Sequence, residues 1–150
     1  MKKVESIIFV CLGNICRSPI AEGIAKREVS KRGLDIKIAS AGTGDWHIGE
    51  APCENSIRIA KEKGVDISHQ RAHQITANAL QQYDRVIALD DSNLTNIKKV
   101  GSSNLSKLGS YGFNNEDVPD PFFFPGFEGF EKVYNMIEVC VCNLLDELKD

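Results

Sequence analysis

The sequence has no long apolar segment and no excess of either charge. Its 150 residues carry a formal net charge of −3, so the overall charge does not favour nucleic acid or an anionic membrane. No apolar run approaches the length that crosses a bilayer, and the first residues lack the apolar stretch of a signal peptide. We therefore expect one soluble domain, residues 1–150, with no nucleic-acid or membrane partner.

Metal and nucleotide motifs are also missing. Only three histidines occur, and neither they nor the cysteines have the spacing of a metal site. There is no GxGxxG motif, and no Walker lysine follows Gly13. Five cysteines are an odd number, which disfavours a disulfide framework and favours a reducing cytoplasm. We expect no metal and no cofactor.

The most informative stretch is CLGNICRSP, residues 11–19. It lies between an apolar run at 7–10 and a helical pattern, so it is predicted to be a strand-to-helix turn, where free N–H groups and the helix dipole attract anions. Gly13 and Asn14 tolerate the left-handed backbone that such a loop needs, and Pro19 suits the first helical position. The predicted anion-binding loop consists of Leu12, Gly13, Asn14, Ile15, Cys16, Arg17 and Ser18.

Cys11 at the mouth of this loop indicates phosphoryl transfer. The positive field favours its thiolate, and a thiolate would repel an anion that was only bound. The arrangement makes sense if the sulfur attacks phosphorus and forms a cysteinyl-phosphate. We predict Cys11 as the nucleophile, Arg17 as a planar fork for two phosphoryl oxygens, and Ser18 as a hydroxyl donor to the thiolate. The plain alternative is a buried structural cysteine beside a surface arginine.

Strand and helix patterns alternate along the chain, with no repeat or linker. Strands are predicted at 6–10, 36–39, 85–89 and 105–108, and helices at 18–31, 52–64, 76–82, 90–99 and 127–149. This order predicts an α/β fold: a flavodoxin-like, doubly wound parallel sheet of four strands in the order 2-1-3-4, with helices on both faces. Ligands of such sheets bind beyond the carboxyl ends of the strands, where the Cys11 loop lies.

A phosphate ester also needs a proton on its leaving oxygen, and no acid lies near Cys11 in sequence. Asp120 is the candidate, because prolines on both sides stiffen the long loop at 109–126 that presents it. From the residues alone, Asp117 or another carboxylate is an equal alternative. Asp90 and Asp91 are interpreted as a helix cap, and Cys53, Cys140 and Cys142 as structural residues.

Residues 10–19 resemble the phosphate-binding signature V-C-x-G-N-I-C-R-S-P of the low molecular weight protein tyrosine phosphatases, and the likeness extends along the whole chain. The resemblance implies hydrolysis of phosphotyrosine in proteins or of small aryl phosphates. It places the general acid, which later acts as base, in a late Asp-Pro pair, matched by Asp120 and Pro121. The family's following Tyr-Tyr is Phe122-Phe123 here, which removes any regulation by phosphorylation of those tyrosines.

The same resemblance suggests further roles around the loop. Trp46 and Phe122 are expected to be aromatic walls of the substrate pocket, and Ser40 and His69 to hold Asn14 in its strained shape. Cys16 either fills a small apolar space or forms a reversible disulfide with Cys11, and the resemblance supports the disulfide. We expect a monomer or a weak dimer.

Three other functions remain open. A protein arginine phosphatase of the same fold tends to carry threonine where Ile15 stands. An arsenate reductase needs relay cysteines, and residues 80–89 contain none, while Cys140 and Cys142 lie in a predicted helix. A non-catalytic phosphopeptide-binding module would not need both Cys11 and Asp120.

Overall fold

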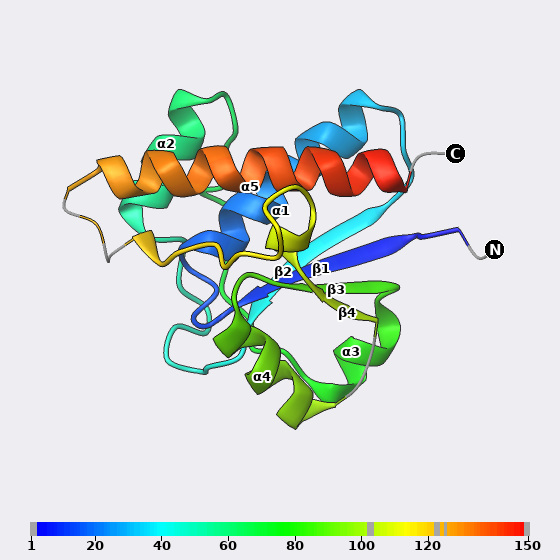
Figure 1. The fold of residues 1–150 in the computed structure, drawn as a ribbon. Helices are drawn as coiled ribbons and strands as arrows, with labels where there is room; N and C mark the ends of the chain where they lie inside the picture. The colour runs from blue at the N-terminus through cyan, green and yellow to red at the C-terminus, as the bar shows by residue number, and fades with distance from the viewer. Residues whose placement is uncertain (1–2, 102–103, 122–123, 125, 149–150) are drawn as a thin grey trace.

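The computed structural model describes residues 3–101, 104–121, 124 and 126–148. Its centre is a sheet of four parallel strands in the order β2-β1-β3-β4 (Figure 1). The strands are β1 (Ser6–Cys11), β2 (Lys37–Gly42), β3 (Arg85–Ala88) and β4 (Leu105–Lys107). The predicted α/β class, strand order and parallel pairing are confirmed.

Helices cover both faces of this sheet (Figure 1). One face carries α1 (Arg17–Lys31), α2 (Glu54–Glu62) and α5 (Glu128–Glu147), and the other carries α3 (Ala77–Gln82) and α4 (Asp91–Val100). A short 3₁₀ helix, η1 (Leu108–Ser110), follows β4. None of the helices in the described ranges combines the length and apolar character needed to cross a membrane.

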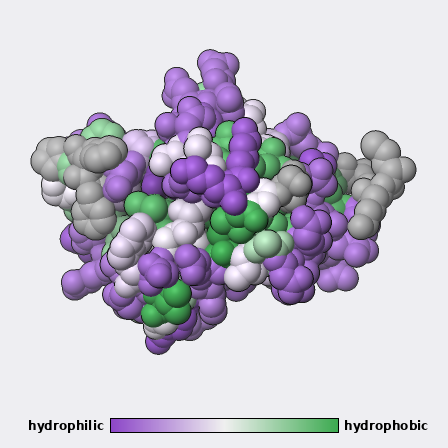
Figure 2. Space-filling view, turned by 90° about the horizontal axis from the view of Figure 1, so that it is seen from below, coloured by the Kyte–Doolittle hydropathy of each residue, from purple (hydrophilic) through white to green (hydrophobic). Residues whose placement is uncertain are grey.

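Strand β1 divides the core into two parts because its side chains alternate between the faces. Ile7 and Phe9 pack toward α1 and α5, whereas Ile8 and Val10 pack toward α3 and α4. Every residue of β1 is buried, which explains why this strand is a continuous apolar run. The outer surface over α3 and α4 is mostly hydrophilic, with hydrophobic side chains in separate groups (Figure 2).

The observed element ends differ from the predicted ones by a few residues. Both β1 and β2 run further, to Cys11 and Gly42, so the anion loop begins at the last residue of the central strand. Helix α1 begins at Arg17, which makes Pro19 its third residue instead of its first. Pro19 still lies in the first turn, where its missing N–H leaves no intrahelical bond unmade.

Because all four strands are parallel, the segments after β1, β2 and β3 meet at one edge of the sheet. The N–H of Thr43 donates to the carbonyl of Cys11 at 2.9 Å, which joins the segments after β1 and β2. The N–H of Val118 donates to the carbonyl of Leu89 at 2.9 Å, which brings the late loop to the end of β3. Residues far apart in sequence therefore surround Cys11.

Candidate active site

The loop between β1 and α1 takes its shape from one left-handed residue. Asn14 has φ of 58°, as its residue type predicted, whereas Gly13 is not among the positive-φ residues of the described chain. A side chain at position 13 would instead come within 3.0 Å of the His47 ring. Gly13 therefore serves close packing, and Asn14 alone provides the left-handed turn.

Gly42, the last residue of β2, allows the loop to pass close to the sheet. A Cβ atom there would lie 2.7 Å from the carbonyl oxygen of Leu12 and 3.0 Å from the backbone nitrogen of Asn14. Both contacts are with main chain, which has little freedom to move away. Glycine is thus required where the second strand ends against the anion loop.

The side-chain amide of Asn14 is fully hydrogen-bonded. Its Nδ2 donates to Ser18 Oγ at 2.8 Å and to Ser40 Oγ at 2.9 Å, and its Oδ1 accepts from the N–H of His73 at 2.9 Å. An amide can donate two hydrogen bonds, and both are used. This network holds the left-handed residue in place from three separate segments of the chain.

The network continues on both sides of Asn14. Ser40 donates to Glu22 Oε1 at 2.5 Å, so its oxygen is free to accept from Asn14. Ser18 accepts from Asn14 and lies 2.9 Å from Cys11 Sγ, so its hydroxyl is within hydrogen-bond distance of the sulfur. Glu22 is buried, at 8% exposed, and the sequence analysis did not identify it.

The structure does not bring His69 to Asn14. His69 is exposed, and the third bond to the asparagine comes from the main chain of His73, four residues later. The reason is that the chain at 72–74 runs beside the end of β2, where the N–H of Gly42 donates to the carbonyl of His73 at 2.7 Å. The expected role of His69 is therefore taken by a backbone group, which residue types cannot reveal.

Cys11 lies at the bottom of the resulting loop and is 3% exposed. Its sulfur accepts from the N–H of Asn14 at 3.3 Å and contacts the hydroxyl of Ser18. The N–H groups of Gly13, Ile15 and Cys16 have no acceptor within the described part of the chain. Donors gathered in this way around one sulfur favour an anion both at the sulfur and directly above it.

Arg17 is held at one of its nitrogens by two acceptors. Nη1 donates to Asp90 Oδ2 at 2.7 Å and to the carbonyl of Val118 at 2.8 Å. Among the described residues, Nη2 and Nε have no protein partner. The guanidinium is buried, at 6% exposed, yet it keeps one edge for a planar ligand such as two phosphoryl oxygens. The interpretation of Asp90 as a helix cap was therefore incomplete.

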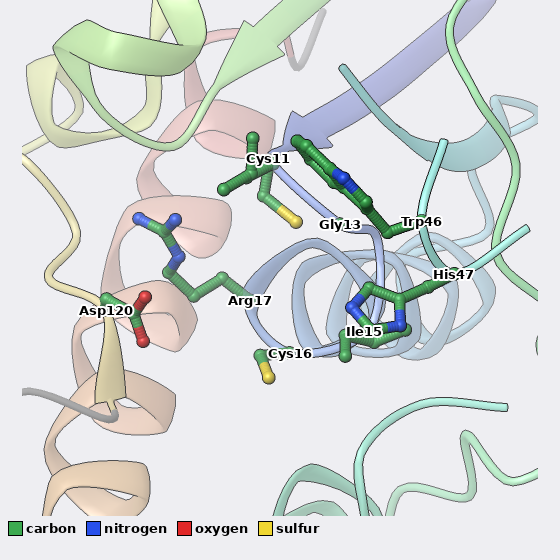
Figure 3. Close-up of a pocket in the computed structure, with 9 residues that line it drawn as sticks. Cys11, Gly13, Ile15, Cys16, Arg17, Trp46, His47 and Asp120 are labelled. Carbon is green, nitrogen blue, oxygen red and sulfur yellow. The ribbon is translucent and has the colours of Figure 1, made fainter. Parts of the chain in front are cut away.

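Asp120 lines the same pocket as Cys11 and Arg17. In Figure 3 it lies on the Arg17 side, and Trp46 and His47 lie on the opposite side. Asp117, the alternative acid, is bonded elsewhere, since its Oδ1 accepts from Lys107 Nζ at 2.8 Å and from the N–H of Asp91 at 3.0 Å. Asp120 therefore lies in the pocket with Cys11, whereas Asp117 is bonded to Lys107 and Asp91. The residues alone had favoured neither carboxylate as the acid.

One wall of the pocket is apolar and aromatic. Trp46 is 66% exposed at the mouth, so it covers the opening without being part of the core. The other expected wall, Phe122, lies outside the described residues. The residues that line the pocket are Cys11, Leu12, Gly13, Ile15, Cys16, Arg17, Trp46, His47 and Asp120.

The sulfur of Cys16 contacts Cys53, at 2.9 Å between the two Sγ atoms. Cys53 caps the N-terminus of α2, and its N–H donates to the carbonyl of Ile15 at 2.7 Å. Cys53, which the sequence analysis interpreted as a structural residue, thus contacts the anion loop. Among the described residues, no cluster of His, Cys, Asp and Glu has the geometry of a metal site.

An arginine and a thiol at an anion loop, on the carboxyl edge of a parallel sheet, are typical of a phosphatase of the cysteine-dependent type. Residues 6–150 match the model of the family described as low molecular weight phosphotyrosine protein phosphatase. The chain therefore belongs to this family, and it is an enzyme, a protein-tyrosine-phosphatase.

Individual relatives agree with this assignment. PtpA of Staphylococcus saprophyticus, a low molecular weight protein-tyrosine-phosphatase, is 38% identical over 146 residues, which cover 94% of this chain and 92% of that protein. The crystal structure of YfkJ from Bacillus subtilis is similar with a TM-score of 0.88 at 35% identity, covering 97% of this chain and 95% of that one. The crystal structure of a Drosophila arginine phosphatase is also similar, with a TM-score of 0.88 at 31% identity, covering 96% of this chain and 98% of that one.

Proposed function

We propose that this phosphatase hydrolyses phosphotyrosine in proteins, or small aryl phosphates, with Cys11 as nucleophile, Arg17 as phosphoryl-binding residue and Asp120 as general acid and then base. The observation that carries the proposal is the convergence of these three residues on one pocket. They come from three different segments: the end of β1, the start of α1 and the late loop.

In the first step, Cys11 Sγ attacks phosphorus and the bond to the tyrosyl oxygen breaks. Asp120 supplies the proton that this oxygen needs, since a phenolate is a poor leaving group. The Ser18 hydroxyl lies 2.9 Å from the sulfur, where it is placed to donate to the attacking thiolate. The products are free tyrosine and a cysteinyl-phosphate.

The transferring phosphoryl group carries its charge on three equatorial oxygens. The unpaired edge of Arg17 supplies two parallel donors for them, and the N–H groups of Gly13, Ile15 and Cys16 supply more. These donors are aligned before the substrate arrives, because Asn14 and Asp90 hold the loop and the guanidinium. Little reorganisation is needed during the reaction.

In the second step, water attacks the cysteinyl-phosphate. Asp120, now a carboxylate, accepts the proton of this water, and Cys11 leaves as a thiolate. The same two residues thus return to their starting states. Because the mechanism needs a reduced Cys11, it supports a reducing compartment such as the cytoplasm as the place where the enzyme works.

The walls of the pocket favour an aromatic substrate. Trp46 at the mouth and Ile15 in the lining offer apolar contact to a phenyl ring. A phosphoserine side chain has no ring to make these contacts. Ile15 also favours phenyl over the charged guanidinium of phosphoarginine, which would be left without a polar partner at that position.

Asp120→Asn tests the acid role, and Asp117→Asn is the matched control. We expect Asp120→Asn to lower turnover of phosphotyrosine by about 10²- to 10⁴-fold, but turnover of p-nitrophenyl phosphate far less, because its leaving group needs no proton. Asp117→Asn should lower both rates by the same factor. Equal losses for the two substrates in Asp120→Asn would remove Asp120 from the acid role.

A further inference from the structure

The sulfur atoms of Cys16 and Cys53 lie 2.9 Å apart, within hydrogen-bond distance, beside the substrate pocket. Cys16 is in the anion loop and is 9% exposed, whereas Cys53 is half-buried and does not line the pocket. Cys11 has other partners, namely the Ser18 hydroxyl and the N–H of Asn14. The thiol nearest to Cys16 is therefore Cys53.

The contact is fixed by the main chain and not only by two rotamers. The N–H of Cys53 donates to the carbonyl of Ile15 at 2.7 Å, and Ser56 Oγ donates to the carbonyl of Cys16 at 3.1 Å. Each bond joins the anion loop to the first turn of α2 within three residues of the sulfurs. The two backbones thus hold the sulfurs together in the reduced protein.

The two thiols differ in reactivity. The hydrogen bond with Cys16, together with the contacts with Ser56, lowers the pKa of Cys53 to about 6 despite its partial burial. The contact with Cys53 and burial raise the pKa of Cys16 well above its ordinary range. The shifts favour a thiolate on Cys53 and a protonated thiol on Cys16.

We propose that Cys16 and Cys53 form a dithiol site that a hydroperoxide converts into a disulfide, leaving Cys11 as a free thiol. The thiolate of Cys53 attacks the peroxide, the O–O bond breaks, and the departing oxygen is protonated by water, which leaves a sulfenic acid on Cys53. The sulfur of Cys16 then attacks the sulfur of Cys53. The S–O bond breaks, and the departing hydroxide takes the proton of Cys16 to form water.

This reaction competes with a disulfide between Cys11 and Cys16, the pairing that the sequence resemblance suggested. If peroxide reaches Cys11 first, Cys16 attacks the Cys11 sulfenic acid and closes the Cys11–Cys16 disulfide. The Cys53 thiolate then attacks the Cys16 sulfur and releases Cys11 as a thiolate. Both routes end at the Cys16–Cys53 disulfide, and two electrons pass to the peroxide in each.

Peptide mapping separates the two products directly. Trypsin places Cys11 and Cys16 together in peptide 4–17 and Cys53 in peptide 38–58. A Cys16–Cys53 disulfide joins these two peptides, whereas a Cys11–Cys16 disulfide makes peptide 4–17 lighter by two hydrogen atoms. The protein is treated with hydrogen peroxide, alkylated with iodoacetamide under denaturing conditions, digested without reductant and analysed by mass spectrometry.

We expect the joined peptides as the main product, with Cys11 alkylated. A main product with the internal disulfide of peptide 4–17, or with Cys16 and Cys53 both alkylated while Cys11 is oxidised, would overturn the proposal. This readout does not depend on phosphatase activity, so it stands or fails separately from the proposed function.

Activity after peroxide provides the second readout, and this part rests on the proposed function. Wild-type protein should keep most of its activity, while Cys53→Ser should lose most of it and recover it with dithiothreitol. Cys53→Ala repeats the test without a hydroxyl, and Cys142→Ser, which changes a half-buried cysteine on α5, should behave like the wild type. Equal peroxide sensitivity of wild type and both Cys53 variants would contradict the release of Cys11.

Discussion

Asp90 holds Arg17 with one carboxylate oxygen and caps helix α4 with the other. Its Oδ2 lies 2.7 Å from Arg17 Nη1, and its Oδ1 accepts from the N–H of Asn93 at 2.7 Å. The ion pair is largely buried, with the side chains 7% and 18% exposed. One carboxylate thus fixes the start of α4 and the direction of the guanidinium together.

Asp90→Asn separates these two roles. Asparagine is as good an N-cap as aspartate, so any fall in the free energy of unfolding reports the loss of the buried ion pair and not of the cap. The amide no longer neutralises Arg17, so we expect kcat/KM for phosphotyrosine to fall by about 10- to 100-fold, equivalent to ~1.4–2.7 kcal/mol. Steady-state kinetics and thermal unfolding of the same preparation measure both effects.

Asp90→Ala is the companion variant, because it removes the cap as well as the ion pair. It should lose activity and be about 1 kcal/mol less stable than Asp90→Asn, because only the alanine variant also lacks the cap. An Asp90→Asn protein with wild-type kinetics would show that the orientation of Arg17 does not depend on this carboxylate.

Asn14 has a left-handed backbone and a side-chain amide bonded to Ser18, Ser40 and His73. Two substitutions distinguish the contribution of the backbone from that of the amide. Asn14→Ala and Asn14→Gly both remove the bonds to Ser18 and Ser40, so inorganic phosphate should inhibit both variants more weakly than wild type. Only alanine resists φ of 58°, so Asn14→Ala should unfold more easily than Asn14→Gly by roughly 1 kcal/mol. Equal stability of the two variants would argue against backbone strain at this position.

The fold was predictable because its signals are local and strong. The apolar run of β1, the caps at Thr76 and Asp90 and the amphipathic pattern of α5 placed those elements within a few residues of where they lie. The anion loop was equally evident, since its residues are contiguous in sequence. Strand order then followed from the alternation of strands and helices.

The supports of the site were harder to predict because they come from distant segments. Glu22 lies one helical turn after Ser18 and so faces the same way, which is a usable signal. Asp90 follows β3, the neighbour of β1, so the rule for carboxyl ends of parallel strands also points to it. The bond from His73 to Asn14 is made by main chain, and no residue type encodes it. The nearness of Cys53 to Cys16 depends on how α2 packs.

Alkylation as a function of pH tests the state of Cys53 without any oxidant. Iodoacetamide reacts with thiolates, and the pKa of Cys53 is lowered to about 6, so its rate should rise through that pH and then level off. Burial raises the pKa of Cys142, so its rate should still be rising at alkaline pH. Fragment-ion mass spectrometry of tryptic peptides 38–58 and 133–149 from one reaction measures both rates, since the fragments distinguish Cys142 from Cys140. Parallel profiles for the two cysteines would contradict the proposed thiolate.

Ser56→Ala adds a control to that experiment. Ser56 contacts the Cys53 sulfur at 3.1 Å and contributes to its lowered pKa. Without this hydroxyl, the profile of Cys53 should move to higher pH, and the profile of Cys142 should stay where it is.

The central claim is tested most directly by steady-state hydrolysis of phosphotyrosine, phosphoserine and phosphoarginine peptides in EDTA, with Cys11→Ser as the control. The account predicts selective turnover of phosphotyrosine that disappears in the variant, because the hydroxyl of serine is a far weaker nucleophile than a thiolate. A preference for phosphoarginine would contradict the role given to Ile15. Turnover that survives in Cys11→Ser would contradict the cysteinyl-phosphate mechanism itself.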